Sequence, residues 1–395
     1  MSDNGGAPLR IAVLGSTGSI GRSTLEVVDR HPGRFRVVAL SANRSVDALA
    51  EQVARFEPDT AVLAGTGALD GVDDLPDARW TTGRDAVLEV CERDDVDVVV
   101  NALVGAAGLE PTLRSLRAGK RVALANKESL VAGGNLVHEA ARAGRGELIP
   151  VDSEHSAILQ CVRGCGENEV ERIVLTASGG PFRGWSRSAL ESVTPEDALD
   201  HPTWSMGAKI TVDSATLANK ALEVVEAHFL YDLGYDDIDV VVHPQSIIHS
   251  FVEFVDGSVL AQMGFPTMEL PILYALTHPT RVSDGALRTF DPVASSPLTF
   301  EPVDDGAFPL FGLGVAAGRT GGTATAVFNA ANEVAVDAFL NGRIGILEMA
   351  DVVSGTLTDV ECRALEDIDD VLEADREARE FAGGLVRSFG ARAGR

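Results

Sequence analysis

The sequence predicts an α/β protein whose N-terminal part forms a doubly wound parallel sheet. Over the first 150 residues, short apolar runs of strand length alternate with stretches of helical periodicity. This alternation is typical of parallel strands covered by helices on both faces of the sheet. The chain has 395 residues, of which 45% are hydrophobic. It is too long for a single core, so we expect two or three domains.

The elements of this sheet follow one another at short intervals. Strands are expected at residues 9–14, 35–40, 60–63, 96–101, 121–125 and 148–151, with helices between them such as 23–30, 45–56 and 83–93. Parallel sheets of this kind bind ligands at the carboxyl ends of their strands. The polar residues that follow three of the strands are therefore predicted to form a site; they are Asn101, Asn126-Lys127-Glu128 and Asp152-Ser153-Glu154.

A glycine-rich turn joins the first strand to the first helix, with the sequence Gly-Ser-Thr-Gly-Ser-Ile-Gly at residues 15–21. Glycines let the backbone turn tightly and approach a pyrophosphate, whose charge then meets the N-terminus of the helix. The spacing is G-x-x-G-x-x-G and not G-x-G-x-x-G, so an ordinary tight turn is the alternative. The strand and helix on either side favour a dinucleotide site.

The second strand is followed by Asn43, Arg44 and Ser45, where an NAD-binding chain usually has an acidic residue. A carboxylate at this position accepts a hydrogen bond from the ribose 2′-hydroxyl, whereas an arginine and small polar groups suit a 2′-phosphate. The segment therefore favours NADPH over NADH. A surface arginine in a turn is the alternative.

Asp152 and Glu154 follow the last strand of the domain and are separated by one residue. In an extended segment alternate side chains share a face, so both carboxylates would converge on a cleft as hard oxygen ligands for Mg²⁺ or Mn²⁺. The same residues would also suit the cap and first turn of a helix that starts near Ser156. Both interpretations stay open on this segment alone.

A third carboxylate, Glu223, lies on a helix expected from Ser214 onward, with Asp213 or Ser214 as its cap. Asn219, Lys220 and Glu223 share one arc at spacings of three and four residues, so they can meet one ligand. A surface ion pair between Lys220 and Glu223 is the alternative.

Two loops between Glu154 and the helix expected from Ser214 suggest a phosphate site and a lid that closes over the active site. Ser178 and two glycines follow a strand at 172–176 and can form an anion-binding nest, although a simple turn fits as well. Residues 201–207, His-Pro-Thr-Trp-Ser-Met-Gly, suit a lid that excludes water, with Trp204 as a possible core anchor instead. His243 and His249 are expected to be structural histidines.

Composition narrows the classes of partner. The formal net charge of −26 argues against nucleic acid as a partner, because phosphate binding needs a basic surface. No apolar run is long enough to span a bilayer, and the first residues do not resemble a signal peptide, so a cytoplasmic protein without membrane contact is expected. The four cysteines show no paired metal spacing, and we expect free thiols.

Eight motifs in order along the chain resemble the 1-deoxy-D-xylulose 5-phosphate reductoisomerase family. They are GSTGSIG (15–21), ALANKESL (123–130), PVDSEHSA (150–157), TASGGPF (176–182), HPTWSMG (201–207), VDSATLANKALE (212–223), HPQSIIHS (243–250) and FNAANEVAV (328–336). The resemblance implies a reaction that starts from 1-deoxy-D-xylulose 5-phosphate. Its carbon skeleton rearranges by retro-aldol cleavage and re-aldol joining, and NADPH then reduces the aldehyde to 2-C-methyl-D-erythritol 4-phosphate, on the way to isoprenoids.

The resemblance also implies a role for each residue of the site. The metal ligands, for Mg²⁺, Mn²⁺ or Co²⁺, would be Asp152, Glu154 and Glu223. The substrate phosphate would be held by Ser178, Ser214, Asn219 and Lys220, and the hydroxyl end by Lys127, Ser153 and Glu154. The lid would contribute His201, Trp204 and Met206. The cofactor would contact Thr17, Gly18, Ser19, Ile20, Asn43, Arg44, Ser45, Asn126, Glu128 and Gly207. The catalytic residues would be Lys127, Asp152, Glu154, His201 and Glu223.

Family architecture implies a Rossmann-like NADPH domain at 1–150 and an α+β catalytic domain with a flexible lid at 151–285. A linker at 286–301 and a C-terminal α-helical domain at 302–395 would follow, in a homodimer. The prolines at 292, 297 and 302 and the helical patterns after them agree with this division. Two rivals are a different NADP-dependent sugar or semialdehyde dehydrogenase and a nonenzymatic NADPH-sensing module. Neither would need three carboxylates and a lid.

Overall fold

The protein consists of two compact units, each of which is assembled from three separate stretches of chain. The computed structural model describes residues 7–65, 67, 69, 74–166 and 169–393. The first unit comprises Met1–Ser129, Val137–Ser156 and Thr267–Leu287, and the second comprises Leu130–Leu136, Ala157–Pro266 and Arg288–Arg395. Domain limits near residues 151 and 285 stay a prediction.

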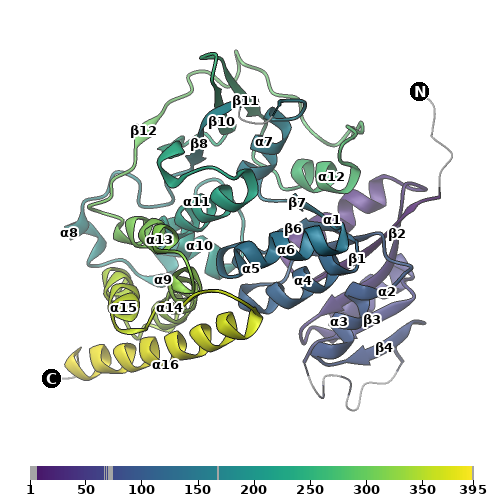
Figure 1. The fold of residues 1–395 in the computed structure, drawn as a ribbon, viewed down its shortest axis with the longest axis horizontal. Helices are drawn as coiled ribbons and strands as arrows, with labels where there is room; N and C mark the ends of the chain where they lie inside the picture. The colour runs from purple at the N-terminus through teal and green to yellow at the C-terminus, as the bar shows by residue number, and fades with distance from the viewer. Residues whose placement is uncertain (1–6, 66, 68, 70–73, 167–168, 394–395) are drawn as a thin grey trace. The chain divides into compact units, whose positions relative to one another are not determined.

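A parallel sheet of seven strands forms the centre of the first unit (Figure 1). Its order is β4-β3-β2-β1-β5-β6-β7, so the strand order reverses at β1, where a doubly wound sheet binds its ligand. The strands are β1 (Leu9–Leu14), β2 (Phe35–Ala42), β3 (Thr60–Leu63), β4 (Arg79–Thr82), β5 (Val98–Asn101), β6 (Arg121–Leu124) and β7 (Glu147–Pro150). This order confirms the α/β, Rossmann-like class that the alternating pattern predicts.

The helices of the first unit cover this sheet because their apolar sides face it. They are α1 (Ser19–Arg30), α2 (Val46–Phe56), α3 (Arg84–Glu92), the 3₁₀ turn η1 (Gly105–Gly108), α4 (Leu109–Arg117), α5 (Lys127–Gly133), α6 (Asn135–Gly144) and α12 (Glu269–Thr277). Helix α5 continues into the second unit. The late helix α12 packs on α1 and against β6 and β7, and Arg30 of α1 pairs with Glu269 and Asp284 at 2.7 and 2.8 Å.

The second unit contains a five-stranded sheet of order β11-β10-β8-β9-β12. Within this sheet the β8–β9 pair is parallel, and the pairs β10–β11, β8–β10 and β9–β12 are antiparallel. The strands are β8 (Val170–Ala177), β9 (Ile238–Val242), β10 (Ile248–Phe254), β11 (Val259–Met263) and β12 (Glu301–Pro302). One apolar cluster joins this sheet to Ile158 of α7 (Ser153–Cys161) and to Val224 and Ala227 of α11 (Ala218–Tyr231).

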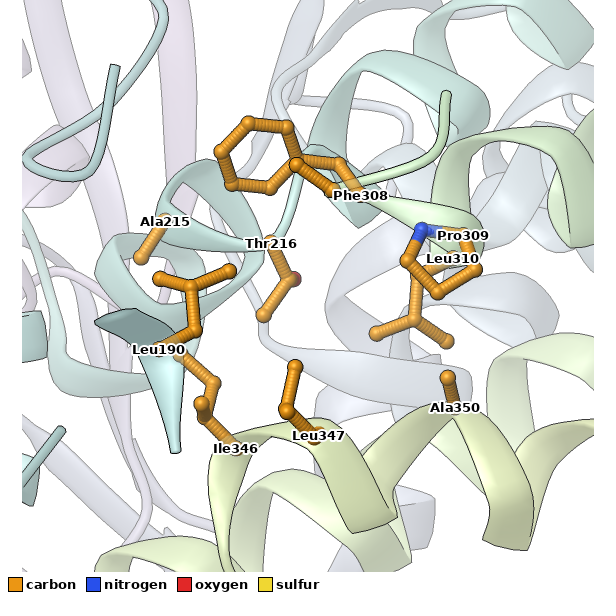
Figure 2. Close-up of a pocket in the computed structure, with 10 residues that line it drawn as sticks. Leu190, Ala215, Thr216, Phe308, Pro309, Leu310, Ile346, Leu347 and Ala350 are labelled. Carbon is orange, nitrogen blue, oxygen red and sulfur yellow. The ribbon is translucent and has the colours of Figure 1, made fainter. Parts of the chain in front are cut away.

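The remaining helices of the second unit pack mainly on one another. They are α8 (Arg187–Leu190), α9 (Pro195–Leu199), α10 (Ala208–Ala215), α13 (Pro309–Thr320), α14 (Ala324–Leu340), α15 (Ile346–Asp359) and α16 (Ile368–Ala393), with a short 3₁₀ turn η2 (Tyr235–Asp237). Helix α14 is buried over nearly its whole length between α13, α15 and α16. A small apolar pocket lies between α8, α10, α13 and α15 (Figure 2).

Two local predictions are corrected by this arrangement. The edge strand β4 is not among the predicted strands, because its sequence, Arg-Trp-Thr-Thr, is not a run of apolar residues. Its residues are exposed or half-buried in the structure. Asp213 and Ser214 do not cap a helix but lie inside α10. The chain instead breaks at Leu217, whose φ of 58° is left-handed, before α11 begins. This break turns α11 away from α10.

Candidate active site

The glycine-rich turn between β1 and α1 has the close packing that its spacing suggests. Gly15 has a φ of +79°, and a Cβ there would lie 2.6 Å from the carbonyl oxygen of Ala102. A Cβ on Gly21 would overlap the Gly15 carbonyl and the Ser16 backbone. The first glycine therefore makes the turn and the third lets the helix approach it, as in dinucleotide-binding turns. Thr17, Gly18, Ser19 and Ile20 lie between them and are exposed or half-buried.

We expect Gly15→Ala to destabilise the protein and to weaken NADPH binding. The variant combines a left-handed backbone with a clash against Ala102, and each effect costs on the order of 1–3 kcal/mol. Gly33→Ala is the matched control, because Gly33 has a similar φ of +81° but nothing within 4 Å of a Cβ. Urea unfolding and NADPH titration of both variants measure the difference. Equal losses in the two variants would show that the contact with Ala102 does not matter.

The end of β2 presents the predicted 2′-phosphate residues to solvent. Asn43, Arg44 and Ser45 are all exposed. The neighbouring glycine turn is bonded to helix α2, since the Ser16 hydroxyl donates to Gln52 Oε1 at 2.6 Å and Gln52 Nε2 donates to the Ser16 carbonyl at 2.9 Å. The turn itself is held by backbone hydrogen bonds, since the Val46 N–H donates to the Arg44 carbonyl and the Gly65 N–H to the Asn43 carbonyl, both at 2.9 Å.

Two asparagines at the ends of β5 and β6 have structural partners. Asn101 donates to the Gly108 carbonyl and to Thr112, both at 2.8 Å. Asn126 donates to the carbonyls of Leu103 and Gly105 at 3.0 Å. Asn101 was predicted to be a site residue, but its buried amide is occupied in shaping the loop. Asn126 shapes the same loop, and its contact with a cofactor stays a prediction.

The carboxylates after β7 lie at the start of helix α7, as the second interpretation of the sequence predicts, and metal binding stays a prediction. Asp152 Oδ1 accepts a hydrogen bond from the Glu154 backbone N–H at 3.2 Å at the start of α7, which is the cap predicted as the alternative. Its other oxygen pairs with Lys127, which is almost buried. Ser153 donates to Glu154 Oε2 at 2.5 Å. Asp152 therefore caps α7 through one oxygen and pairs with the Lys127 ammonium through the other.

In the second unit, Glu223 is a buried carboxylate with buried partners. It is 1% exposed, and it accepts from Asn219 at 2.5 Å and pairs with Lys220, which is 4% exposed. The surface ion pair considered as an alternative is therefore wrong. A buried charge is retained only where partners or a metal compensate it. The three residues meet as the helical spacing predicts.

His201 joins two of the predicted phosphate residues in the second unit. Its Nε2 lies 3.1 Å from Ser178 Oγ and 3.2 Å from Ser214 Oγ. Its Nδ1 accepts from the backbone N–H groups of Thr203 and Trp204 at 3.1 and 2.9 Å. An acceptor at Nδ1 requires the neutral ring with its proton on Nε2. The Nε2–H of His201 therefore faces the hydroxyl oxygens of Ser178 and Ser214, and phosphate binding by these three residues stays a prediction.

We expect the loop at residues 201–207, the predicted lid, to become more mobile at low pH. Burial lowers the pKa of His201 below its ordinary value, and protonation of Nδ1 would break both backbone hydrogen bonds. A lowered folded-state pKa means that this stabilisation is complete above the unfolded pKa and is lost as pH falls through the folded one. NMR titration of the imidazole and KM for the substrate against pH measure it. If KM for the substrate rose with falling pH to the same extent in His201→Asn as in the native protein, His201 would not be the group that titrates.

The remaining residues of the predicted lid are partly accessible to solvent. Trp204 and Met206 are half-buried, and the Trp204 ring is 6.5 Å from that of His249. Gly207 is the exposed residue that precedes α10. His243 donates from Nδ1 to the Thr299 carbonyl at 2.9 Å and accepts at Nε2 from the Ile247 backbone N–H at 3.2 Å, which is the structural role expected for it. The cysteines are free thiols.

Sequence reasoning missed the buried polar contacts next to Ser214. Lys209 and Asn332 both contact Asp213, at 2.9 and 2.7 Å, directly beside Ser214. Asn332 lies within the motif FNAANEVAV, where two asparagines in an apolar helix could have signalled a buried polar contact.

The doubly wound sheet of the first unit, with a glycine turn after its first strand, is the fold of nucleotide-dependent enzymes. The second unit adds a buried carboxylate and a histidine that contacts two serines. Three sequence profiles sharpen this class. They are described as 1-deoxy-D-xylulose 5-phosphate reductoisomerase (residues 11–134) and two C-terminal domains of the same enzyme (148–231 and 263–381). The chain belongs to the 1-deoxy-D-xylulose 5-phosphate reductoisomerase family.

Proteins of known sequence or structure match this chain over nearly its full length. The reductoisomerase of Heliobacterium modesticaldum is 50% identical over 381 residues, covering 94% of this chain and 96% of that protein. That of Mycobacterium tuberculosis is 52% identical over 377 residues, covering 95% and 90%. The Zymomonas mobilis enzyme in complex with NADPH has a TM-score of 0.88 at 42% identity, covering 96% and 100%. A reductoisomerase with NADPH, fosmidomycin and magnesium has a TM-score of 0.91 at 37% identity, covering 96% and 98%.

Proposed function

We propose that this protein converts 1-deoxy-D-xylulose 5-phosphate to 2-C-methyl-D-erythritol 4-phosphate, with NADPH as reductant and a divalent metal ion, in isoprenoid biosynthesis. Full-length identity of about half to reductoisomerases carries the proposal. The glycine turn, the buried Lys220–Glu223 pair and the His201 anion site support it.

NADPH oxidation, followed by absorbance, tests the proposed function. With the ketose phosphate and Mg²⁺ or Mn²⁺, NADPH should be consumed in proportion to substrate, and chelation of the metal should stop the reaction. A different sugar or semialdehyde dehydrogenase would leave this substrate unchanged. A nonenzymatic sensing module would bind NADPH without consuming it. Either result would overturn the proposal.

We propose Asp152, Glu154 and Glu223 as the metal ligands. Each offers one carboxylate oxygen, and a set of hard oxygen donors suits Mg²⁺ or Mn²⁺. The residues also fit by charge, because Asp152 and Glu223 each hold a lysine cation in the described structure. When bound, a divalent ion would polarise the substrate carbonyl and stabilise the enediolate of the rearrangement.

Substrate binding is proposed to follow the polar groups of the second unit. Ser178, Ser214, Asn219 and Lys220 would hold the phosphate, and His201 would donate its Nε2–H to it. The His201 ring is already oriented for this by Thr203 and Trp204. Trp204 and Met206 would then exclude water. Lys127, Ser153 and Glu154 would hold the hydroxyl end, where the Lys127 ammonium can stabilise negative charge on oxygen.

The cofactor is proposed to lie across the carboxyl ends of β1 and β2. Thr17, Gly18, Ser19 and Ile20 would meet the pyrophosphate at the start of α1. Asn43, Arg44 and Ser45 would hold the 2′-phosphate, and Asn126, Glu128 and Gly207 would complete the site. Replacing Arg44 with alanine should raise KM for NADPH and leave KM for NADH unchanged. Equal changes for both cofactors would sink this assignment.

We also propose a cytoplasmic homodimer that pairs through β11. Strand β11 is an edge of its sheet, and Val259, Leu260 and Met263 are 50%, 49% and 37% exposed. Exposed apolar edge strands are prone to pair with another chain. Light scattering should give a dimer for the native protein and a monomer for Leu260→Lys, and a native monomer would refute the proposal. Among the described residues, helices that could cross a bilayer are lacking.

A further inference from the structure

The feature that carries this inference is Asp213, a carboxylate in the interior of α10 that is 1% exposed. Its Oδ1 accepts a hydrogen bond from Asn332 Nδ2 at 2.7 Å. Its Oδ2 lies 2.9 Å from Lys209 Nζ, one turn earlier in the same helix. A charged group at this depth needs such partners, because an isolated one would be expensive to bury. Asp213 is therefore held by a hydrogen bond at Oδ1 and by an ion pair at Oδ2.

Asn332 is unusual for its surroundings in α14. It is 0% exposed, and its neighbours Phe328, Ala331 and Ala335 belong to the apolar core of the second unit. Its Oδ1 lacks a hydrogen-bond partner among the residues that the structure describes. Leaving a buried amide oxygen unsatisfied is destabilising. The feature that offsets this cost is the hydrogen bond that Asn332 donates to Asp213.

Anchoring Asp213 sets the rotation of α10 about its own axis. Successive residues of a helix are turned by about 100°, so a fixed Asp213 fixes the direction of Ser214. Ser214 Oγ lies 3.2 Å from His201 Nε2. Behind it the loop after β8 is packed so closely that a Cβ on Gly180 would lie 2.7 Å from the Ser214 carbonyl oxygen.

The C-terminal end of α10 meets a mostly apolar pocket. Ala215 and Thr216 line the apolar pocket with Leu190 and Leu310 (Figure 2). The Thr216 hydroxyl donates within α10 itself, to the Val212 carbonyl at 3.0 Å. Apolar contacts are non-directional. The contacts of Asp213 with Asn332 and Lys209 are directional, and we infer that they orient Ser214.

We propose that Asn332 and Asp213 are positioning residues, through which the C-terminal helix α14 aims Ser214 at the phosphate of the substrate. The inference rests on the proposed function. Neither residue touches substrate in this proposal, and both act through Ser214. Loss of the Asn332–Asp213 bond should therefore weaken binding of the phosphorylated substrate and leave the cofactor untouched.

The test compares Asn332→Leu with Asn329→Leu in the full-length protein. Asn329 is the matched control, since it is 1% exposed in the same helix but donates to Glu333 of α14 at 3.1 Å and not to α10. For Asn332→Leu, KM for the ketose phosphate should rise roughly tenfold or more, the effect of losing a hydrogen bond to a charged group. KM for NADPH should stay within twofold. The control should change neither.

A double exchange tests whether the bond between Asn332 and Asp213 itself is responsible for the change in KM. The exchange Asp213→Asn with Asn332→Asp restores a donor and an acceptor between the helices, so it should recover part of the lost KM. If Asn332→Leu does not fold, Asn332→Ser, which is too short to reach Asp213, replaces it. An unchanged KM, or equal changes in the Asn329 control, overturns the inference while wild-type turnover upholds the function. No wild-type turnover of the ketose phosphate overturns both.

Discussion

Replacing Glu223 with glutamine should reduce kcat by a factor on the order of 10³, because a metal ion supplies several kcal/mol of transition-state stabilisation. The amide keeps the shape of the side chain but loses its charge, so the proposed metal site keeps only two carboxylates. The half-saturating concentration of Mg²⁺ should also rise. Steady-state kinetics across a metal titration give both values.

The control for this variant is Glu226→Gln on the same helix. Glu226 is 3% exposed, so the two substitutions remove the same charge at similar depth. Only the Glu223 variant should lose its response to Mg²⁺. Full turnover of Glu223→Gln in metal-free buffer would exclude the mechanism that we propose.

Replacing Lys220 with methionine should impair both substrate binding and folding. The variant removes the cation proposed to hold the phosphate, so KM for the ketose phosphate should rise about 10- to 100-fold. It also removes the cation that pairs with the buried Glu223 carboxylate, and breaking a buried ion pair costs about 3–5 kcal/mol of unfolding free energy. Kinetics and urea unfolding measure the two effects separately.

A second substitution distinguishes the two effects of Lys220→Met. Adding Glu223→Gln removes the uncompensated carboxylate, so the double variant should recover stability but not activity. Lys120→Met is the control for removal of a buried lysine, since Lys120 is 9% exposed in the first unit. If the double variant were as unstable as Lys220→Met, the buried pair would not explain the loss.

The glycine turn could be predicted from sequence because its determinants are local. The turn needs a residue with positive φ at Gly15 and a residue without Cβ at Gly21, and both requirements are visible as letters. The parallel strands were predictable for a similar reason, because strands buried on both faces are continuous apolar runs. The carboxyl ends of those strands then indicated where to look for ligands.

The environment of α10 and α11 could not be predicted in the same way. The left-handed conformation of Leu217 has no local signal, because it is imposed by packing in an apolar core. Without this break, Asp213 looked like a helix cap and Lys220 like half of a surface pair. Burial of Lys220 and Glu223 depends on helices that lie far away in the sequence, so their spacing alone left the alternative open.

The position of α12 has a consequence for synthesis on the ribosome. The seven strands of the first unit are translated long before Glu269–Thr277, yet α12 packs against β6 and β7. Until that helix emerges, the nascent chain carries an uncovered apolar face. A premature stop between β7 and α12 should therefore release an aggregating fragment and not a folded nucleotide-binding domain. Completion of the first unit must wait until much of the second has been made.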